Sequence, residues 1–513
     1  MKSLKYKVAD FLEDRKHSGE VITALIICAV LVFNVILCYL TEIFGLYFYK
    51  AKYTEDFTIS GMTDDVFDAA MGDGEKITIT FLMDHDTLEN HSTGSFVLDT
   101  AEQFKKRYGD FITLRYVNTL TKLDQDGNRV ELEKFKTDMR GEEVTLSRTA
   151  VIFESSSGSY RVLSNVRGSV GFVDFYTFDS SGGVVSFNGE TIMSSMIMWV
   201  LADEHKTAYI TANHAETNDA NFATMLAASG YYISAINLQD GDVPEDAAMV
   251  VISNPKNDFE RAAAGSGIET EIETEIERLE KYVNEGGSLY VSLDPYVKRL
   301  NNLETFIESF GIKFRVGSTD AGELRYLVRD PDRAITIDGY TLLTDFAAGG
   351  IADTISATVK RYSNGGIILR DAAALELSGN AKPLLVTSES SECTLGGEVA
   401  DGGGSYAVAA HSTRTSDDGE KTANLFVISS IYLCSSDAVT SNAYSNRDFI
   451  YSLFDHAFGA ENPPYGANSV TYVTDDLKNL TMGEAKLYTA LLLAIPVILA
   501  AVGIAVTIRR KNR

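Results

Sequence analysis

Acid–base chemistry is the first function that the sequence suggests, in the stretch TANHAET at residues 211–217. It places His214 and Glu216 two residues apart, directly after an apolar run that is typical of a β-strand. A histidine beside a carboxylate can exchange protons near neutral pH, as general acid–base catalysis requires. A single His-x-Glu pattern is a weak signal, and the competing interpretation is that these polar residues only turn the chain.

Polar residues also follow two later strand-like stretches, 247–253 and 288–293. In open α/β sheets, ligands bind in the crevice beyond the carboxyl ends of the parallel strands. The sequence therefore predicts a ligand crevice at one edge of such a sheet. Its candidate residues are Asn213, His214, Glu216, Asn254, Asp294 and Tyr296.

No attacking group for this crevice is evident in the sequence. There is no Gly-x-Ser-x-Gly turn, and Cys434 is followed by Ser-Ser-Asp instead of a glycine that would permit a sharp turn. Residues 124–128, DQDGN, begin like a calcium loop, but Arg129 stands where such a loop needs glycine and Phe135 where it needs the closing glutamate. No P-loop or zinc spacing occurs. We therefore expect a non-enzymatic protein with no catalytic residues, no cofactor and no metal site. The spacing of Cys393 and Cys434 leaves open whether they form a disulfide.

The elements that would position these residues alternate between strands and helices. Strand patterns at 75–83 and 111–118 flank a helix pattern at 96–109, which predicts a βαβ unit, and 148–163 reads as a hairpin. An apolar helix at 188–203, with Trp199 in its core face, would end this first domain.

The second predicted domain begins near residue 206 and continues the alternation of strands and helices. Its helix at 268–287 would bury a stripe and expose its repeated glutamates to solvent. That stripe consists of Ile268, Ile272, Ile276, Leu279 and Val283. Such alternation favours an α/β fold with a mostly parallel sheet covered on both faces.

Two long apolar segments lie near the ends of the chain, at residues 21–49 and 487–508. Each has the ~20 residues that a helix needs to cross a bilayer. Basic residues flank both segments: Lys2, Lys5, Lys7, Arg15 and Lys16 at one end, and Arg509, Arg510, Lys511 and Arg513 at the other. The positive-inside rule then predicts a two-pass protein of the cell membrane, with both termini cytoplasmic and a large extracytoplasmic middle region.

The charge balance bears on partners. With 72 acidic and 45 basic residues, the chain has a formal net charge of −27. Such a chain repels a phosphate backbone, so we expect no nucleic-acid partner.

The succession TAYITANHAET, AAMVVISNP, IERLEKYVNEGGSLYVSLDP and LETFIESFGI resembles the GldG-like auxiliary components of ABC-type transport systems, a family associated with gliding motility. His214 and Glu216 match the family's Gly-His-Gly-Glu, whereas Asn213 and Ala215 replace its two glycines. The resemblance implies a fold like that of intraflagellar-transport proteins and class I glutamine amidotransferases, without the catalytic cysteine. It also implies an ABC ATPase and a multi-span permease as partners, beside the lipid bilayer.

The predicted order along the chain combines these features. It is a cytoplasmic tail (1–20), a transmembrane helix (21–49), two α/β domains (50–205 and 206–460), a linker (461–486), a transmembrane helix (487–508) and a cytoplasmic tail (509–513). The function predicted first is a non-catalytic, membrane-anchored accessory subunit of an ABC-type transport system that binds substrate or partner proteins. The alternatives are a hydrolase using His214, Glu216 and Asp294, or a surface scaffold or adhesion protein.

Overall fold

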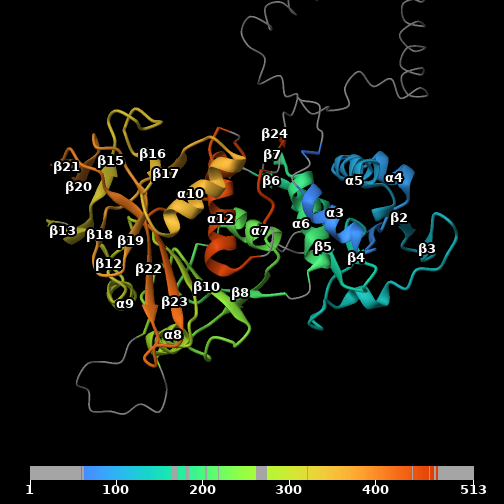
Figure 1. The fold of residues 1–513 in the computed structure, drawn as a ribbon, viewed down its shortest axis with the longest axis horizontal. Coiled ribbons are helices and arrows are strands. Elements are labelled where there is room, and N and C mark those ends of the chain that lie inside the picture. Colours follow the sequence, from blue (N-terminus) through green and yellow to red (C-terminus); the bar gives the residue numbers. More distant parts are fainter. Residues whose placement is uncertain are drawn as a thin grey trace, which may run out of the picture. The chain divides into compact units, whose positions relative to one another are not determined.

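The computed structural model describes residues that lie within the unit Asp56–Tyr472, with gaps (Figure 1). The described residues are 59–60, 63–163, 171–178, 184–202, 205–217, 219–260, 274–320, 322–441, 443–460, 463–466 and 470–471.

The first sheet has five strands in the order β3-β2-β1-β4-β5. The strands are β1 (Ile77–Phe81), β2 (Ile112–Asn118), β3 (Leu123–Asp124), β4 (Val151–Ser155) and β5 (Tyr160–Leu163). Strands β1 and β2 are parallel and are joined through α5 (Gly94–Tyr108), which confirms the predicted βαβ unit. Strands β4 and β5 form the predicted hairpin. Helix α6 (Gly189–Leu201) is buried along nearly its whole length, and Trp199 belongs to the core as predicted.

Shorter elements complete this part of the unit. They are α3 (Asp64–Gly72), α4 (His85–Glu89) and a three-stranded sheet of β6 (Tyr176–Phe178), β7 (Val184–Phe187) and β24 (Val470–Thr471).

The second, larger sheet has the main strand order β17-β16-β19-β22-β23-β11-β10-β8-β9. Its strands are β8 (Thr207–Thr211), β9 (Tyr232–Ile236), β10 (Ala247–Ser253), β11 (Leu289–Ser292), β16 (Thr341–Phe346), β17 (Ile367–Arg370), β19 (Lys382–Val386), β22 (Ala407–Thr415) and β23 (Thr422–Ile428). The run from β9 to β23 is parallel, whereas β22, β19, β16 and β17 pair antiparallel. The prediction of a mostly parallel sheet is therefore wrong, and the sheet is mixed. The reason is the tight turn at Gly419 (φ 77°), which reverses the chain between β22 and β23.

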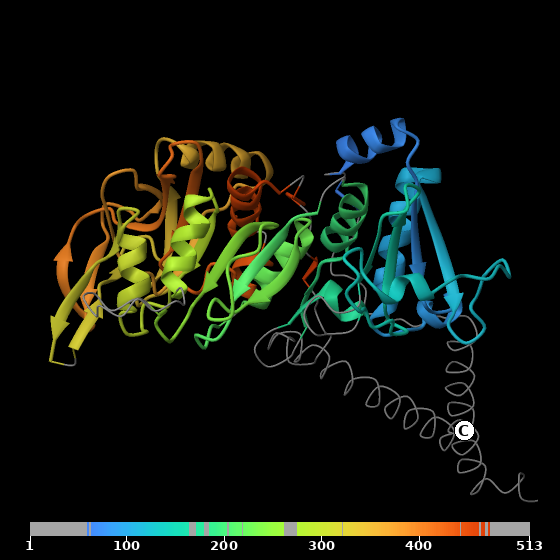
Figure 2. The same cartoon turned by 90° about the horizontal axis from the view of Figure 1, so that it is seen from below.

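Helices cover both faces of the large sheet (Figure 2). Successive residues of β10 alternate between two cores, as the two-residue period of a strand requires. Met249 and Val251 pack in a core with α7 (Ala220–Ala228), α10 (Ile351–Tyr362) and α12 (Asn446–Phe458). Val250 and Ile252 pack in the other, with α8 (Glu275–Asn284) and α9 (Asn301–Glu308). Burial on both faces explains why this strand is an unbroken apolar run.

Two small strands, β12 (Ile312–Phe314) and β18 (Leu375–Leu377), join the large sheet where β18 pairs with β22. Separate from it are a two-stranded sheet of β13 (Val316–Thr319) and β14 (Gly322–Arg325) and a three-stranded sheet of β15 (Leu327–Arg329), β20 (Glu392–Leu395) and β21 (Glu398–Gly402). The short helix α11 (Ser436–Val439) precedes α12.

The structure corrects the predicted two-pass architecture. No helix among the described residues combines the length and the apolar character needed to cross a membrane. The two segments for which spans were predicted, 21–49 and 487–508, lie outside the described residues. The flanking transmembrane helices, the cell-membrane localisation and the extracytoplasmic placement of the middle region are therefore without support.

A buried ion pair holds the loop after β11. Arg325 and Glu304 are both 2% exposed at their side chains, and Arg325 Nη2 lies 2.6 Å from Glu304 Oε1. Arg325 Nη1 also donates to the backbone carbonyls of Asp294, at 3.2 Å, and of Val297. The turn at Asp294 and Pro295 after β11 is thus held in place by a charged side chain from β14.

Replacing Arg325 tests this arrangement. We expect Arg325→Leu to lower the free energy of unfolding by about 3–5 kcal/mol, because Glu304 would stay buried without its partner. The matched control is Arg299→Leu, which breaks a more exposed pair with Glu308 and should cost less than about 1 kcal/mol. Urea denaturation followed by circular dichroism measures both, and equal losses would contradict the assignment.

Candidate functional site

The loop after β8 adopts a left-handed backbone conformation, which glycine favours, at two positions that are not glycine. Asn213 (φ 86°) and Ala215 (φ 54°) both lie in the left-handed region, which costs a residue with a Cβ atom free energy. Between them, the carbonyl oxygen of His214 accepts hydrogen bonds from the backbone amides of Lys256 at 2.8 Å and Asn257 at 3.0 Å. The loop after β8 is therefore tied to the loop after β10, and the two bonds offset the backbone strain.

The side chain of His214 is enclosed between two carboxylates. Its Nδ1 lies 3.1 Å from Glu216 Oε1, and its Nε2 lies 3.1 Å from Glu275 Oε2. The ring stacks on Phe259, with 3.8 Å between ring centroids and 7° between planes. His214 is 2% exposed. Both ring nitrogens are thus engaged and out of reach of a substrate.

The charge state of His214 follows from these partners. Burial alone would lower the pKa of His214, but the hydrogen bonds to Glu216 and Glu275 outweigh it and raise the pKa to about 9. Burial would raise the pKa of Glu216, but its hydrogen bonds, first among them the one with His214, lower the pKa below its ordinary value. At neutral pH the group is an imidazolium between two carboxylates, which cannot accept a proton as a general base.

Glu275 is the residue that sequence reasoning missed. The glutamates of the 268–287 segment were predicted to face solvent, which is wrong for Glu275, because it is 1% exposed. Helix α8 begins at Glu275, whereas residues 261–273 lie outside the described residues, so Ile268 and Ile272 are untested. The signal available in the sequence was the capping box of Thr274 and Glu277, which places Glu275 in the first helical turn. The rest of the predicted stripe, Ile276, Leu279 and Val283, is buried.

The other predicted crevice residues divide into two groups. Asn254 contacts the residue that follows Glu216, because its carbonyl oxygen accepts a hydrogen bond from the backbone amide of Thr217. Its own backbone amide donates to the carbonyl oxygen of Ser292. Asp294 instead accepts from the backbone amide of Tyr296, and the side chain of Tyr296, which is 65% exposed, bonds to Asp371. In the described part of the chain, no hydrogen bond or ion pair joins either residue to His214.

Asn213 points elsewhere as well. Its amide donates to the side chain of Gln239 at 2.8 Å, on the exposed side of the loop. The six predicted residues therefore share one edge of the sheet without forming one site.

The cavity at the carboxyl ends of β10, β11 and β23 has a volume of only about 10 Å³, which is room for at most one water molecule. Asn254 and Cys434 are among its lining residues. Cys434 is 4% exposed, and burial raises the pKa of its thiol, so it is not an activated nucleophile. Cys434 and Cys393 are both free thiols.

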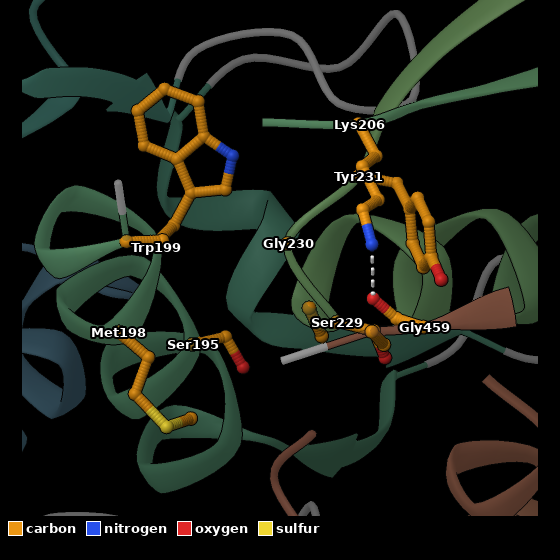
Figure 3. A pocket seen from close by; sticks show the side chains of 11 residues that line it. Ser195, Met198, Trp199, Lys206, Ser229, Gly230, Tyr231 and Gly459 are labelled. Carbon is orange, nitrogen blue, oxygen red and sulfur yellow. Dashed lines mark hydrogen bonds between the residues drawn. The ribbon is translucent and has the colours of Figure 1, made fainter. Parts of the chain in front are cut away.

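A second small cavity lies at the C-terminal ends of α6 and α7, as Figure 3 shows. Its volume is about 30 Å³. Lys206 Nζ donates to the carbonyl oxygen of Gly459 at 3.0 Å beside it, and Trp199 forms part of the wall. None of the predicted crevice residues line it. Across the described ranges, no group of three or more histidine, cysteine, aspartate or glutamate side chains is arranged to hold a metal ion.

Comparisons with known proteins add little. No protein-family model matches the chain. No curated protein matches it. Similar solved structures include the N-terminal domain of mmIFT52, with 16% identity and a TM-score of 0.36 over 50% of this chain and 99% of that chain.

Two further solved structures are about as distant. PurLQS from Thermotoga maritima has 11% identity and a TM-score of 0.27, over 49% of this chain and 98% of that chain. A ThuA-like protein from Bacteroides uniformis has 11% identity and a TM-score of 0.29, over 51% and 95%. Scores this low carry no argument about fold or function, and the GldG-like resemblance stays a prediction.

The charge of His214 predicts a pH dependence. Its pKa in the folded state, about 9, exceeds the ordinary value of 6.5, so its stabilisation is complete below 6.5 and is lost as the pH rises through 9. Relative to a His214→Gln variant, the wild type should lose about 3 kcal/mol of unfolding free energy between about pH 6 and about pH 9.5. Urea titrations at both pH values measure the difference. Parallel pH profiles, or an NMR titration of the ring with an ordinary midpoint, would refute the assignment.

The backbone of the loop predicts a stabilising substitution. Ala215→Gly should raise the free energy of unfolding by about 1 kcal/mol, because glycine adopts the left-handed conformation without steric cost. Ala212→Gly, three positions earlier and outside that conformation, should lower it by about 0.5–1 kcal/mol. Thermal or chemical denaturation compares the two, and destabilisation by both glycines would show that position 215 is unstrained.

Proposed function

We propose that this chain is a non-catalytic accessory subunit of an ABC-type transport system, and that it acts by binding the transported substrate or its partner proteins. An ABC ATPase and a multi-span permease would be those partners.

The observation that carries the non-catalytic part is the enclosure of His214. Both of its ring nitrogens are bonded to carboxylates, and its side chain is removed from solvent. A general base must reach the proton that it abstracts and must be unprotonated near the working pH. His214 meets neither condition, and the thiol of Cys434, which lines the small cavity beside Asn254, is buried. The geometry therefore disfavours the alternative of a hydrolase built on His214, Glu216 and Asp294.

The partner assignment rests on the sequence resemblance to GldG-like components. The left-handed conformation of Asn213 and Ala215 supports it, because both residues replace glycines of the family pattern and still adopt a backbone that glycine favours. The ionic cluster then gives the loop a structural role, which is to hold the ends of β8 and β10 and the start of α8 together.

Co-purification tests the proposal. The tagged full chain, expressed in its native cells and extracted in mild detergent, should bring down a P-loop ATPase and a multi-span permease identified by mass spectrometry. An unrelated tagged protein of similar acidity is the background control. Recovery of the chain without either partner would overturn the assignment to a transport system.

A pair of cysteine variants separates the binding role from hidden catalysis. Cys434→Ala removes the only thiol that lines the cavity by the loop, and Cys393→Ala removes a buried thiol elsewhere. Both variants should capture partners as the wild type does, and none of the three should hydrolyse a panel of esters, amides and glycosides. Turnover that Cys434→Ala abolishes and Cys393→Ala retains would establish an enzyme instead.

A further inference from the structure

Three helices direct their N-terminal turns at a cavity of about 40 Å³ that is distinct from the loop after β8. It is lined by Asn188 and Thr191 from the start of α6, Asn221 and Thr224 from the start of α7, and Arg447 from the start of α12. These helices are labelled near one another in Figure 1, and α7 packs against both α6 and α12. The N-terminal end of a helix carries a partial positive charge and unsatisfied backbone amides.

Two of these three helices begin without a side-chain cap. Neither Asn188 before α6 nor Ser445 before α12 accepts a hydrogen bond from the first helical turn. In contrast, Asp219 caps α7 by accepting from the amides of Asn221 and Phe222. Amides at the starts of α6 and α12 therefore retain the capacity to bind an acceptor.

Arg447 supplies a full positive charge at the same place. It is half-buried, and among the described residues no carboxylate forms an ion pair with it. Its Nε is buried without a hydrogen-bond partner. Arginine in a protein stays charged, and a buried guanidinium is ordinarily paired.

Thr191 provides an independent sign of a missing ligand. It is 5% exposed, and its hydroxyl has no hydrogen-bond partner among the described residues. Leaving a buried hydroxyl unpaired costs free energy, so such groups are ordinarily satisfied. A bound acceptor would satisfy the hydroxyl and the guanidinium together.

The surroundings favour an anion over a cation. No aspartate or glutamate lines the cavity. The carboxylates at the three helix starts are engaged elsewhere: Asp219 caps α7, Glu190 accepts from Ser60, and Asp448 accepts from the amide of Gly466. The volume corresponds to about three water molecules, which is the size class of one tetrahedral oxyanion.

We propose that this cavity binds a phosphate-type oxyanion, held by Arg447, by the Thr191 hydroxyl and by the amides at the starts of α6 and α12. The anion is either free inorganic phosphate or the phosphoryl group of a small monoester. The site does not depend on the function proposed above.

Calorimetric titration of the full chain tests the site. Inorganic phosphate should bind saturably at constant ionic strength, whereas chloride should not. Arg447→Gln should weaken phosphate binding by about tenfold or more, because a charge-assisted hydrogen bond is lost. Thr191→Val keeps the side-chain shape and should weaken it by about three- to tenfold.

The matched control is Arg140→Gln. Arg140 pairs with Asp138 and Glu142 and lines a separate groove of about 260 Å³, so its loss removes the same charge from another place. Phosphate affinity should be unchanged. If Arg447→Gln does not fold, Arg447→Lys and Thr191→Val carry the test, and an affinity equal to the wild type in both would overturn the proposal.

A second arm distinguishes the source of the oxyanion. Glycerol phosphate is titrated beside inorganic phosphate. Tighter binding of glycerol phosphate assigns the site to a phosphate monoester, and tighter binding of inorganic phosphate assigns it to the free anion. No saturable binding of either probe, or equal loss of binding in Arg140→Gln and Arg447→Gln, would refute the site.

Discussion

The described unit depends on the rule that a charge removed from water must find a partner inside the fold. At the loop after β8, His214 is held by Glu216 from its own loop and by Glu275 from the first turn of α8. Removing one member would leave the others buried and unpaired, at a cost of several kcal/mol. The cluster of His214, Glu216 and Glu275 therefore fixes how α8 approaches the sheet. It lies at the carboxyl ends of the strands, where a histidine beside a carboxylate could serve catalysis if it were exposed.

The same rule separates structural from functional charges elsewhere. Arg325 and Glu304 satisfy one another and also hold the backbone of the loop after β11, so nothing about them requires a ligand. Arg447 contrasts with them, because no carboxylate among the described residues pairs with it and it lines a cavity together with the unpaired hydroxyl of Thr191. The sequence suggests that His214 is reactive, but in the structure its side chain is buried between two carboxylates. Arg447 has no sequence motif around it, yet it lines a cavity at the start of α12.

Local periodicity predicted most elements of the fold. The βαβ unit of β1, α5 and β2 and the hairpin of β4 and β5 were expected from residues close in sequence, and the structure contains them. The mostly parallel sheet was not borne out, because strand direction at β22 and β23 depends on one tight turn. The predicted pair of membrane spans found no support in the described region. Helix α10 was not predicted, since its pattern lies within a stretch rich in short strands and glycine.

What the sequence determined by itself is the set of strands and helices, the loop carrying His214 and Glu216, and the absence of a recognisable nucleophile motif. Only the tertiary structure decided what those residues do. His214 and Glu275 are 61 positions apart, and no local pattern relates them. Their contact arises because β8 and β10 are neighbours in the sheet and α8 packs against it. Alternating hydrophobicity reports which face of an element is buried, but it carries no information about which two buried polar groups will meet.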